Sequence, residues 1–176
     1  VGGLRFYERA EIKDAMAYFR ILINKSDNLS LERILNTPKR GLGKAFIKNL
    51  YDIVQKKNVS LYESLKLLIL SGTSNSSQKK NIQNFISIID RHSSALKSTK
   101  HFEVAGSLLD DVGYTEMLQK EKTPESEGRL ENLKKLITDL KNRNSLEEFI
   151  EEVSLLNDTL NDSVFNEKVS LMTLHS

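Results

Sequence analysis

The sequence contains no cysteine, which excludes disulfide bonds, zinc ribbons and thiol nucleophiles. Only two prolines and eight glycines occur in 176 residues, so long uninterrupted helices are permitted. No apolar run approaches the roughly 20 residues that a membrane-spanning helix needs, and we expect no membrane contact. The chain is long enough for one domain with its own core. It starts with Val1 and shows no signal-peptide pattern, and we expect it to be a piece of a longer protein.

The net charge of +2 is small, but the basic residues are unevenly distributed. Between Arg33 and Lys57 there are seven basic residues and one acidic residue, Asp52, so the rest of the chain holds 19 basic and 23 acidic groups. A basic patch on a mildly acidic body fits a localised contact with phosphate groups. A solvated helix face would give the same pattern, and charge alone does not separate the two interpretations.

Apolar residues recur at helical spacing along most of the chain, so we expect a mostly α-helical fold. One apolar stripe runs from Ile12 to Ile23 and ends at a polar stretch, 24–28. The same periodicity predicts helices at 31–35, from 44 onward, at 61–70, around 82–89, at 102–118 with a break at Gly113, from 124 onward and at 146–155. Capping patterns mark three of these starts, namely Ser60 with Glu63, Thr123 with Pro124, and Ser145 with Glu148.

The two ends of the chain differ from this helical body. Leu4–Tyr7 and 169–174 have the pattern of short strands. A helical body between two strand-like ends suggests an insertion into a sheet domain, whose ends must lie close together to rejoin the sheet.

The chain offers no constellation for catalysis, and no catalytic residue or metal ligand is predicted. His92, His101 and His175 have no metal-ligand spacing to one another. There is no nucleophile elbow, no dinucleotide fingerprint and no GxxxxGK[ST] phosphate loop. The chain could therefore not hydrolyse ATP by itself.

A glycine-rich basic loop is the exception to this lack of functional motifs. Residues 38–44 read PKRGLGK and lie between two predicted helices. Glycines let backbone N–H groups approach a phosphate closely, and the start of the following helix adds a partial positive charge. This arrangement is typical of a helix-hairpin-helix phosphate grip, which contacts the DNA backbone and not the bases. The alternative is a tight turn between helices that needs glycine only for its geometry.

Several separated blocks resemble one protein family. The whole set occurs in the order found in UvrD/Rep/PcrA-type superfamily 1 DNA helicases. The blocks are GGLRFYERAEIKD at 2–14, AYFR at 17–20, NTPKRGLG at 36–43, GY at 113–114, RLENL at 129–133 and LMTLHS at 171–176.

The resemblance implies a division of the chain. Residues 1–24 and 168–176 would be pieces of the RecA-like subdomain 2A, the second containing the start of the motif V strand. Residues 25–167 would be the all-helical subdomain 2B. In this family, subdomain 2B grips duplex DNA ahead of the fork and rotates to restrain or activate the motor.

The resemblance also implies DNA-binding residues. Those for the duplex would be Lys39, Arg40, Gly41, Leu42, Gly43 and Lys44. Those for the single strand would be Arg5, Thr173 and His175. The family often has a hydroxyl residue three positions after the second glycine; here that position is Phe46, and its phosphate contact would be lost.

The implied function is that of a part of an ATP-dependent 3′–5′ DNA helicase in DNA repair or replication. The fragment itself would hold no cofactor and be inactive alone, whereas the full-length enzyme would use ATP and Mg²⁺. Its partners would be a duplex/single-strand junction, subdomains 1A, 1B and 2A, and repair proteins, in the bacterial cytoplasm. The alternative is a non-catalytic docking or autoinhibitory module with little DNA affinity of its own.

Overall fold

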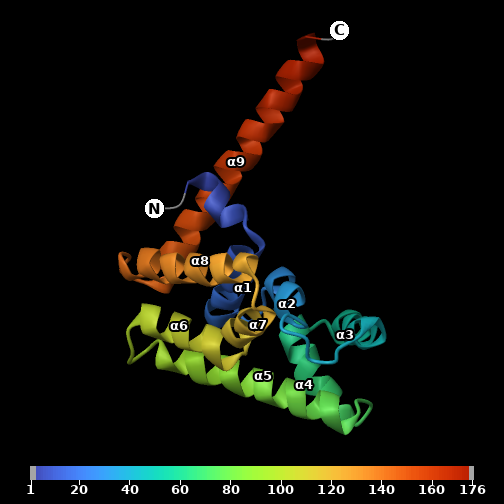
Figure 1. Ribbon diagram of the computed structural model, residues 1–176. Helices are drawn as coiled ribbons and strands as arrows, with labels where there is room; N and C mark the ends of the chain where they lie inside the picture. Colours follow the sequence, from blue (N-terminus) through green and yellow to red (C-terminus); the bar gives the residue numbers. More distant parts are fainter. Residues whose placement is uncertain (1–2, 175–176) are drawn as a thin grey trace.

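The computed structural model describes residues 3–174, and every regular element in that range is helical (Figure 1). The elements are η1 (Leu4–Glu8), α1 (Ala10–Ile23), α2 (Asn28–Ile34), α3 (Lys44–Lys57), α4 (Leu61–Ser71), α5 (Ser76–Ala95), α6 (His101–Asp111), α7 (Tyr114–Glu121), α8 (Pro124–Lys141) and α9 (Leu146–Leu174). The predicted mostly α-helical fold is thus observed. None of the described helices is both long and apolar enough to cross a membrane.

The predicted terminal strands are wrong. Leu4–Glu8 is a 3₁₀ helix, in which the Phe6 N–H donates to the Gly3 carbonyl at 2.9 Å. The segment 169–174 continues α9. Local hydrogen bonds satisfy the backbone in both segments, whereas a strand needs a neighbouring strand to do so. Leucine and methionine, which dominate 171–174, are also good helix formers.

Helix starts were predicted better than the last helix end. Thr123 accepts a hydrogen bond from the Ser126 N–H at 3.0 Å, and Pro124 occupies the first helical position, as predicted. Gly113, with φ +84°, separates α6 from α7, also as predicted. The helix expected to end at 155 instead runs to Leu174, because no glycine or proline interrupts it.

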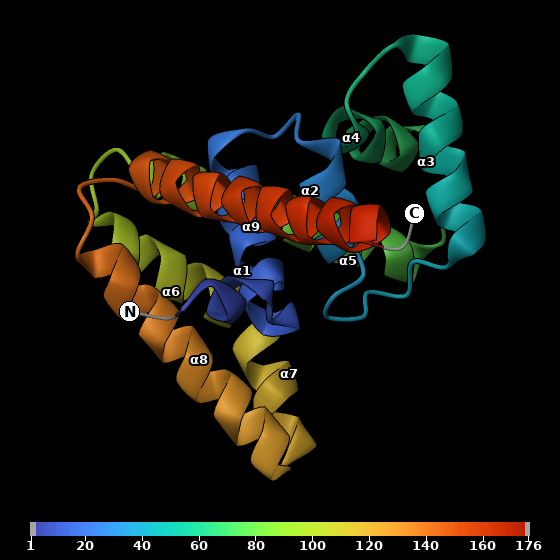
Figure 2. The ribbon, with the colours of Figure 1, turned by 90° about the horizontal axis from the view of Figure 1, so that it is seen from above.

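Helix α1 lies at the centre of the molecule. Nine of its 14 residues are buried, and it packs against α2, α5, α6, α8 and α9 (Figures 1 and 2). Its polar residues are also engaged, since Glu11 accepts from Asn132 and Asp14 accepts from Tyr114, both at 2.8 Å. Residues of α1 therefore share one hydrophobic core with the later helices. The predicted division of the chain at residue 24 stays a prediction.

Two elements lie at the periphery. Helix α3 packs mainly on α4, so the loop that enters α3 lies at the surface beside the start of α5 (Figure 2). Helix α9 packs on η1 and α1 through its first turns and then extends away from the body (Figure 1). All of its residues from 161 to 174 are exposed.

Candidate nucleic-acid interface

The loop of residues 36–43 joins α2 to α3 and contains both glycines of the GLG motif. Gly41 has φ +73°, a conformation that L-residues other than glycine adopt only with strain. Gly43 is the N-cap of α3 in extended conformation and provides no side chain to cap the first turn. A Cβ atom built on either glycine would meet nothing within 4 Å. The two glycines therefore leave an open approach to the backbone at the start of α3.

The backbone N–H groups at positions 40–43 of this loop alternate between bonded and unbonded. The Asn36 side-chain oxygen accepts from the Arg40 N–H at 2.7 Å and, more weakly, from the Leu42 N–H at 3.5 Å. The N–H groups of Gly41 and Gly43 have no acceptor among the described residues. Asn36 thus holds the N–H groups of Arg40 and Leu42, while those of the two glycines remain available to a bound acceptor.

Leu42 and Phe46 anchor the loop in the core. Leu42 and Phe46 are both buried, and Phe46 lies in the first turn of α3. Phe46 thus contributes to packing at the position where the family often has a hydroxyl group.

Arg40 faces the interior of the protein. Its Nη1 donates to the carbonyls of Ile34 and Leu35 at 2.7 and 3.0 Å, which satisfies the C-terminal end of α2. Its Nη2 donates to the Tyr18 hydroxyl at 2.6 Å, and its guanidinium stacks 4.6 Å from the centre of the Phe85 ring. The structure therefore gives Arg40 an intramolecular set of partners, although the sequence placed it among the duplex contacts.

Burial raises the pKa of Tyr18, while the nearby Arg40 acts in the opposite direction. The hydroxyl stays protonated at neutral pH and donates to the Thr37 carbonyl at 2.6 Å. Tyr18 thereby links the central helix α1 to the loop.

Lysine side chains around the loop face solvent. Lys39, Lys44 and Lys48 are exposed, and none has an acidic partner within ion-pair distance among the described residues. A groove of about 330 Å³ at the start of α3 is lined in part by Asn36, Gly43 and Lys44, and also by the acidic residue Glu32. Three unpaired cations next to an uncapped helix start form a surface suited to anionic phosphate groups.

Two side chains on α5 also hold the loop, and sequence reasoning missed them. Asn81 donates to the Arg40 carbonyl at 3.0 Å, and Gln78 donates to the Gly41 carbonyl at 3.2 Å. Asn36 belongs to the NTPKRGLG motif, but the motif does not indicate that its side chain accepts from two loop N–H groups. Polar residues 37 and 41 positions away from their partners carry no local signal that could have revealed these contacts.

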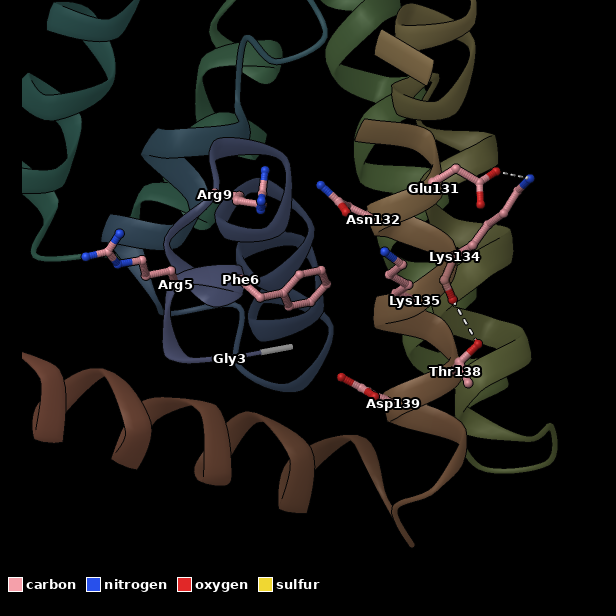
Figure 3. Close-up of a pocket in the computed structure, with 10 residues that line it drawn as sticks. All are labelled: Gly3, Arg5, Phe6, Arg9, Glu131, Asn132, Lys134, Lys135, Thr138 and Asp139. Atoms are coloured by element: carbon pink, nitrogen blue, oxygen red, sulfur yellow. Dashed lines mark hydrogen bonds and ion pairs between the residues drawn. The ribbon is translucent and has the colours of Figure 1, made fainter. Parts of the chain in front are cut away.

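The residues predicted to contact a single strand are not brought to this loop. Arg5 lies in η1 and lines a cavity of about 670 Å³ between η1 and α8, shown in Figure 3. There, Asn132 and Lys135 of α8 face the N-terminal segment, whereas the Arg5 side chain extends away from α8. Thr173 lies near the projecting end of α9 and donates to the Ser170 carbonyl at 2.8 Å. His175 lies outside the described residues.

No metal centre is formed within residues 3–174, where no three histidine, aspartate or glutamate side chains are grouped to hold an ion. His92 lies in the last turn of α5 and is buried, with Nδ1 2.8 Å from the Ile88 carbonyl and Nε2 3.1 Å from Asp111. His101 starts α6 and contacts the Leu140 carbonyl at 2.9 Å. Both histidines therefore have structural contacts.

Comparisons with known proteins agree over the whole length of the chain. Residues 1–176 match the family of UvrD-like helicase C-terminal domains. A probable DNA helicase II homologue from Rickettsia conorii is 37% identical over 178 residues, covering 100% of this chain and 27% of that protein. The ATP-dependent DNA helicase PcrA of Staphylococcus epidermidis is 34% identical over 188 residues, covering 100% of this chain and 25% of that protein. The chain thus spans about a quarter of the length of these relatives.

Proposed function

Because the chain belongs to the family of UvrD-like helicase C-terminal domains, we propose that it is the region that grips duplex DNA in an ATP-dependent 3′–5′ DNA helicase. In this proposal the region corresponds to subdomain 2B with short flanking pieces of subdomain 2A. The grip consists of the backbone N–H groups of Gly41 and Gly43, the start of α3, and the side chains of Lys39 and Lys44. Leu42 anchors the loop, and Arg40 shapes it from inside.

The N–H groups of Gly41 and Gly43 have no acceptor among the described residues and lie next to the uncapped start of α3, and this is the observation that carries the proposal. A phosphate oxygen accepts hydrogen bonds from such groups, and the helix dipole adds to the attraction. The neighbouring lysines attract the phosphate chain from a distance. None of these groups reads a base edge, so binding should depend on DNA charge and shape and not on sequence.

The motor activity would belong to the whole enzyme. In this proposal ATP and Mg²⁺ would be bound by other parts of the enzyme, since this chain has no GxxxxGK[ST] phosphate loop. The proposed partners are a duplex/single-strand junction, helicase subdomains 1A, 1B and 2A, and DNA repair proteins. The proposed place of action is the bacterial cytoplasm, where the chromosome lies.

The proposal is tested by fluorescence anisotropy with a labelled duplex that carries a 3′ single-stranded tail. We expect binding that weakens with salt and that is abolished in Gly43→Asp, which places a carboxylate where a phosphate would lie. Gly128→Asp is the matched control, because Gly128 is exposed on α8 and the change in net charge is the same. Equal binding by the two variants would contradict a grip at the loop.

A docking role is the second candidate, and the projecting part of α9 favours it. Val164, Phe165, Val169, Leu171 and Met172 are large apolar side chains that remain exposed there. Absence of DNA binding at low salt by the wild-type chain would support this candidate over the first.

A further inference from the structure

The conformation of the glycine-rich loop depends on groups outside the loop. Its glycines make the backbone flexible, and ordering such a segment costs conformational entropy. A loop that binds phosphate through its N–H groups binds more tightly when these groups are already oriented before binding. The contacts that orient this loop therefore influence DNA affinity without touching DNA.

Helix α5 supplies two of these contacts, both to carbonyl groups. Asn81 Nδ2 lies 3.0 Å from the Arg40 carbonyl oxygen, and Gln78 Nε2 lies 3.2 Å from the Gly41 carbonyl oxygen. Both bonds hold carbonyl oxygens of consecutive residues toward α5. An unheld carbonyl on this loop would repel an approaching phosphate oxygen, since both carry negative charge.

Gln78 also belongs to the N-terminal cap of α5. Its backbone N–H donates to the Asn75 side chain at 2.8 Å, and its side-chain oxygen accepts from the Asn75 N–H at 3.4 Å, which forms a capping box. The same amide side chain thus connects the start of α5 to Gly41. This connection makes the loop conformation dependent on a helix that lies about 40 residues later in the sequence.

The Arg40 side chain adds to this support. Its side chain bonds the end of α2 and Tyr18 of α1, and it stacks on Phe85, which is also on α5. Residues from α1, α2 and α5 therefore converge on the single residue that precedes Gly41.

We propose that Asn81 and Gln78 of α5, together with Arg40, are positioning residues of the DNA grip, which they orient by holding the loop backbone and not by contacting phosphates. This inference rests on the proposed duplex-binding function of residues 39–44. The grip is then a composite of the α2–α3 loop and α5.

Asn81→Ala and Gln78→Ala test the inference, because both remove a neutral side chain behind the loop. Duplex affinity is measured by anisotropy at several salt concentrations, and stability is measured by urea unfolding. We expect roughly five- to tenfold weaker binding for Asn81→Ala, the equivalent of one hydrogen bond. The slope of log affinity against log salt should stay unchanged, because no cation is removed. A smaller loss in the same direction is expected for Gln78→Ala.

Two comparison variants distinguish a loss of loop positioning from the loss of a direct phosphate contact. Asn84→Ala is the matched control, since Asn84 is exposed on the same helix and has no side-chain hydrogen bond among the described residues. Lys44→Ala should weaken binding and also make the slope shallower by about 0.9, as expected for one lost phosphate contact.

The outcomes are distinguishable. Wild-type affinity for both Asn81→Ala and Gln78→Ala, with weakened binding for Lys44→Ala, would overturn the inference and leave the proposed function in place. If Lys44→Ala and Gly43→Asp also bound the duplex with wild-type affinity, the proposed function would be overturned, and the inference with it. A lower urea midpoint that accounts for the whole loss of binding in Asn81→Ala would reduce Asn81 to a stability role and also overturn the inference.

Discussion

At the scale of single residues, the two glycines of the GLG motif serve different purposes. Gly41 is needed for its backbone conformation, because its φ of +73° strains any residue with a side chain. Gly43 has φ −76° and ψ −178°, which other residues adopt freely. The backbone conformation therefore does not require glycine at position 43. The absence of a side chain matters instead, because it leaves open space next to the start of α3.

Gly43→Ser should separate stability from DNA binding. Serine is a preferred N-cap residue, so we expect α3 to gain a few tenths of a kcal/mol in urea unfolding. Its hydroxyl would engage a first-turn N–H, and its side chain would enter the space left for a phosphate. We therefore expect several-fold weaker duplex binding in anisotropy titrations. Tighter binding by this more stable variant would mean that the open space at Gly43 is not used by phosphate.

Arg40 illustrates why part of the site could not be predicted from the sequence. PKRGLGK predicted an accessible basic loop, and the structure shows exposed Lys39 and Lys44 there. Arg40 has the same charge as its neighbours, and nothing in its local sequence indicates that its guanidinium bonds two carbonyls of α2 and the hydroxyl of Tyr18. Tertiary partners determine which way a long side chain points, and a local pattern does not contain them.

At the scale of elements, the sequence predicted where helices start, but it did not predict the secondary structure of the two chain ends. A start such as Thr123-Pro124 is encoded within three or four residues, because the cap is a local hydrogen bond. The segment 169–174 alternates like a strand but follows α9 without a breaker. Strand or helix then depends on whether a sheet edge is available to pair with, which is a tertiary property.

Helix α9 combines a packed part and an exposed part, and two phenylalanines distinguish them. Phe149 is 1% exposed, whereas Phe165 on the same helix is 66% exposed. We expect Phe149→Ala to lower the free energy of unfolding by about 3–5 kcal/mol. Phe165→Ala should change it by less than about 0.5 kcal/mol. Urea denaturation followed by circular dichroism measures both, and similar losses would show that the end of α9 is packed in solution.

At the scale of the whole molecule, the helices share one core, and three exposed lysines, Lys39, Lys44 and Lys48, lie in the α2–α3 loop and in the first turns of α3. Helix α1 lies between α8 on one side and α5 on the other, so the body supports the α2–α3 loop from several directions (Figures 1 and 2). The small net charge of +2 gives little general attraction for DNA. Affinity must then come from a few localised contacts. The slope of log affinity against log salt should therefore report the number of phosphate contacts.

Three exposed lysines set the expected salt dependence, namely Lys39 and Lys44 of the grip and Lys48, which lies one turn further along α3. Three phosphate contacts give a slope of about −2.7 in log affinity against log salt, or about 40-fold weaker duplex binding at 200 mM than at 50 mM salt. Lys39→Ala should reduce the magnitude of this slope by about 0.9. Lys120→Ala removes the same charge from α7, where Lys120 pairs with Glu116, and should leave the slope unchanged. If both variants changed the slope equally, attraction would depend on net charge, and the loop would lose its special place in DNA binding.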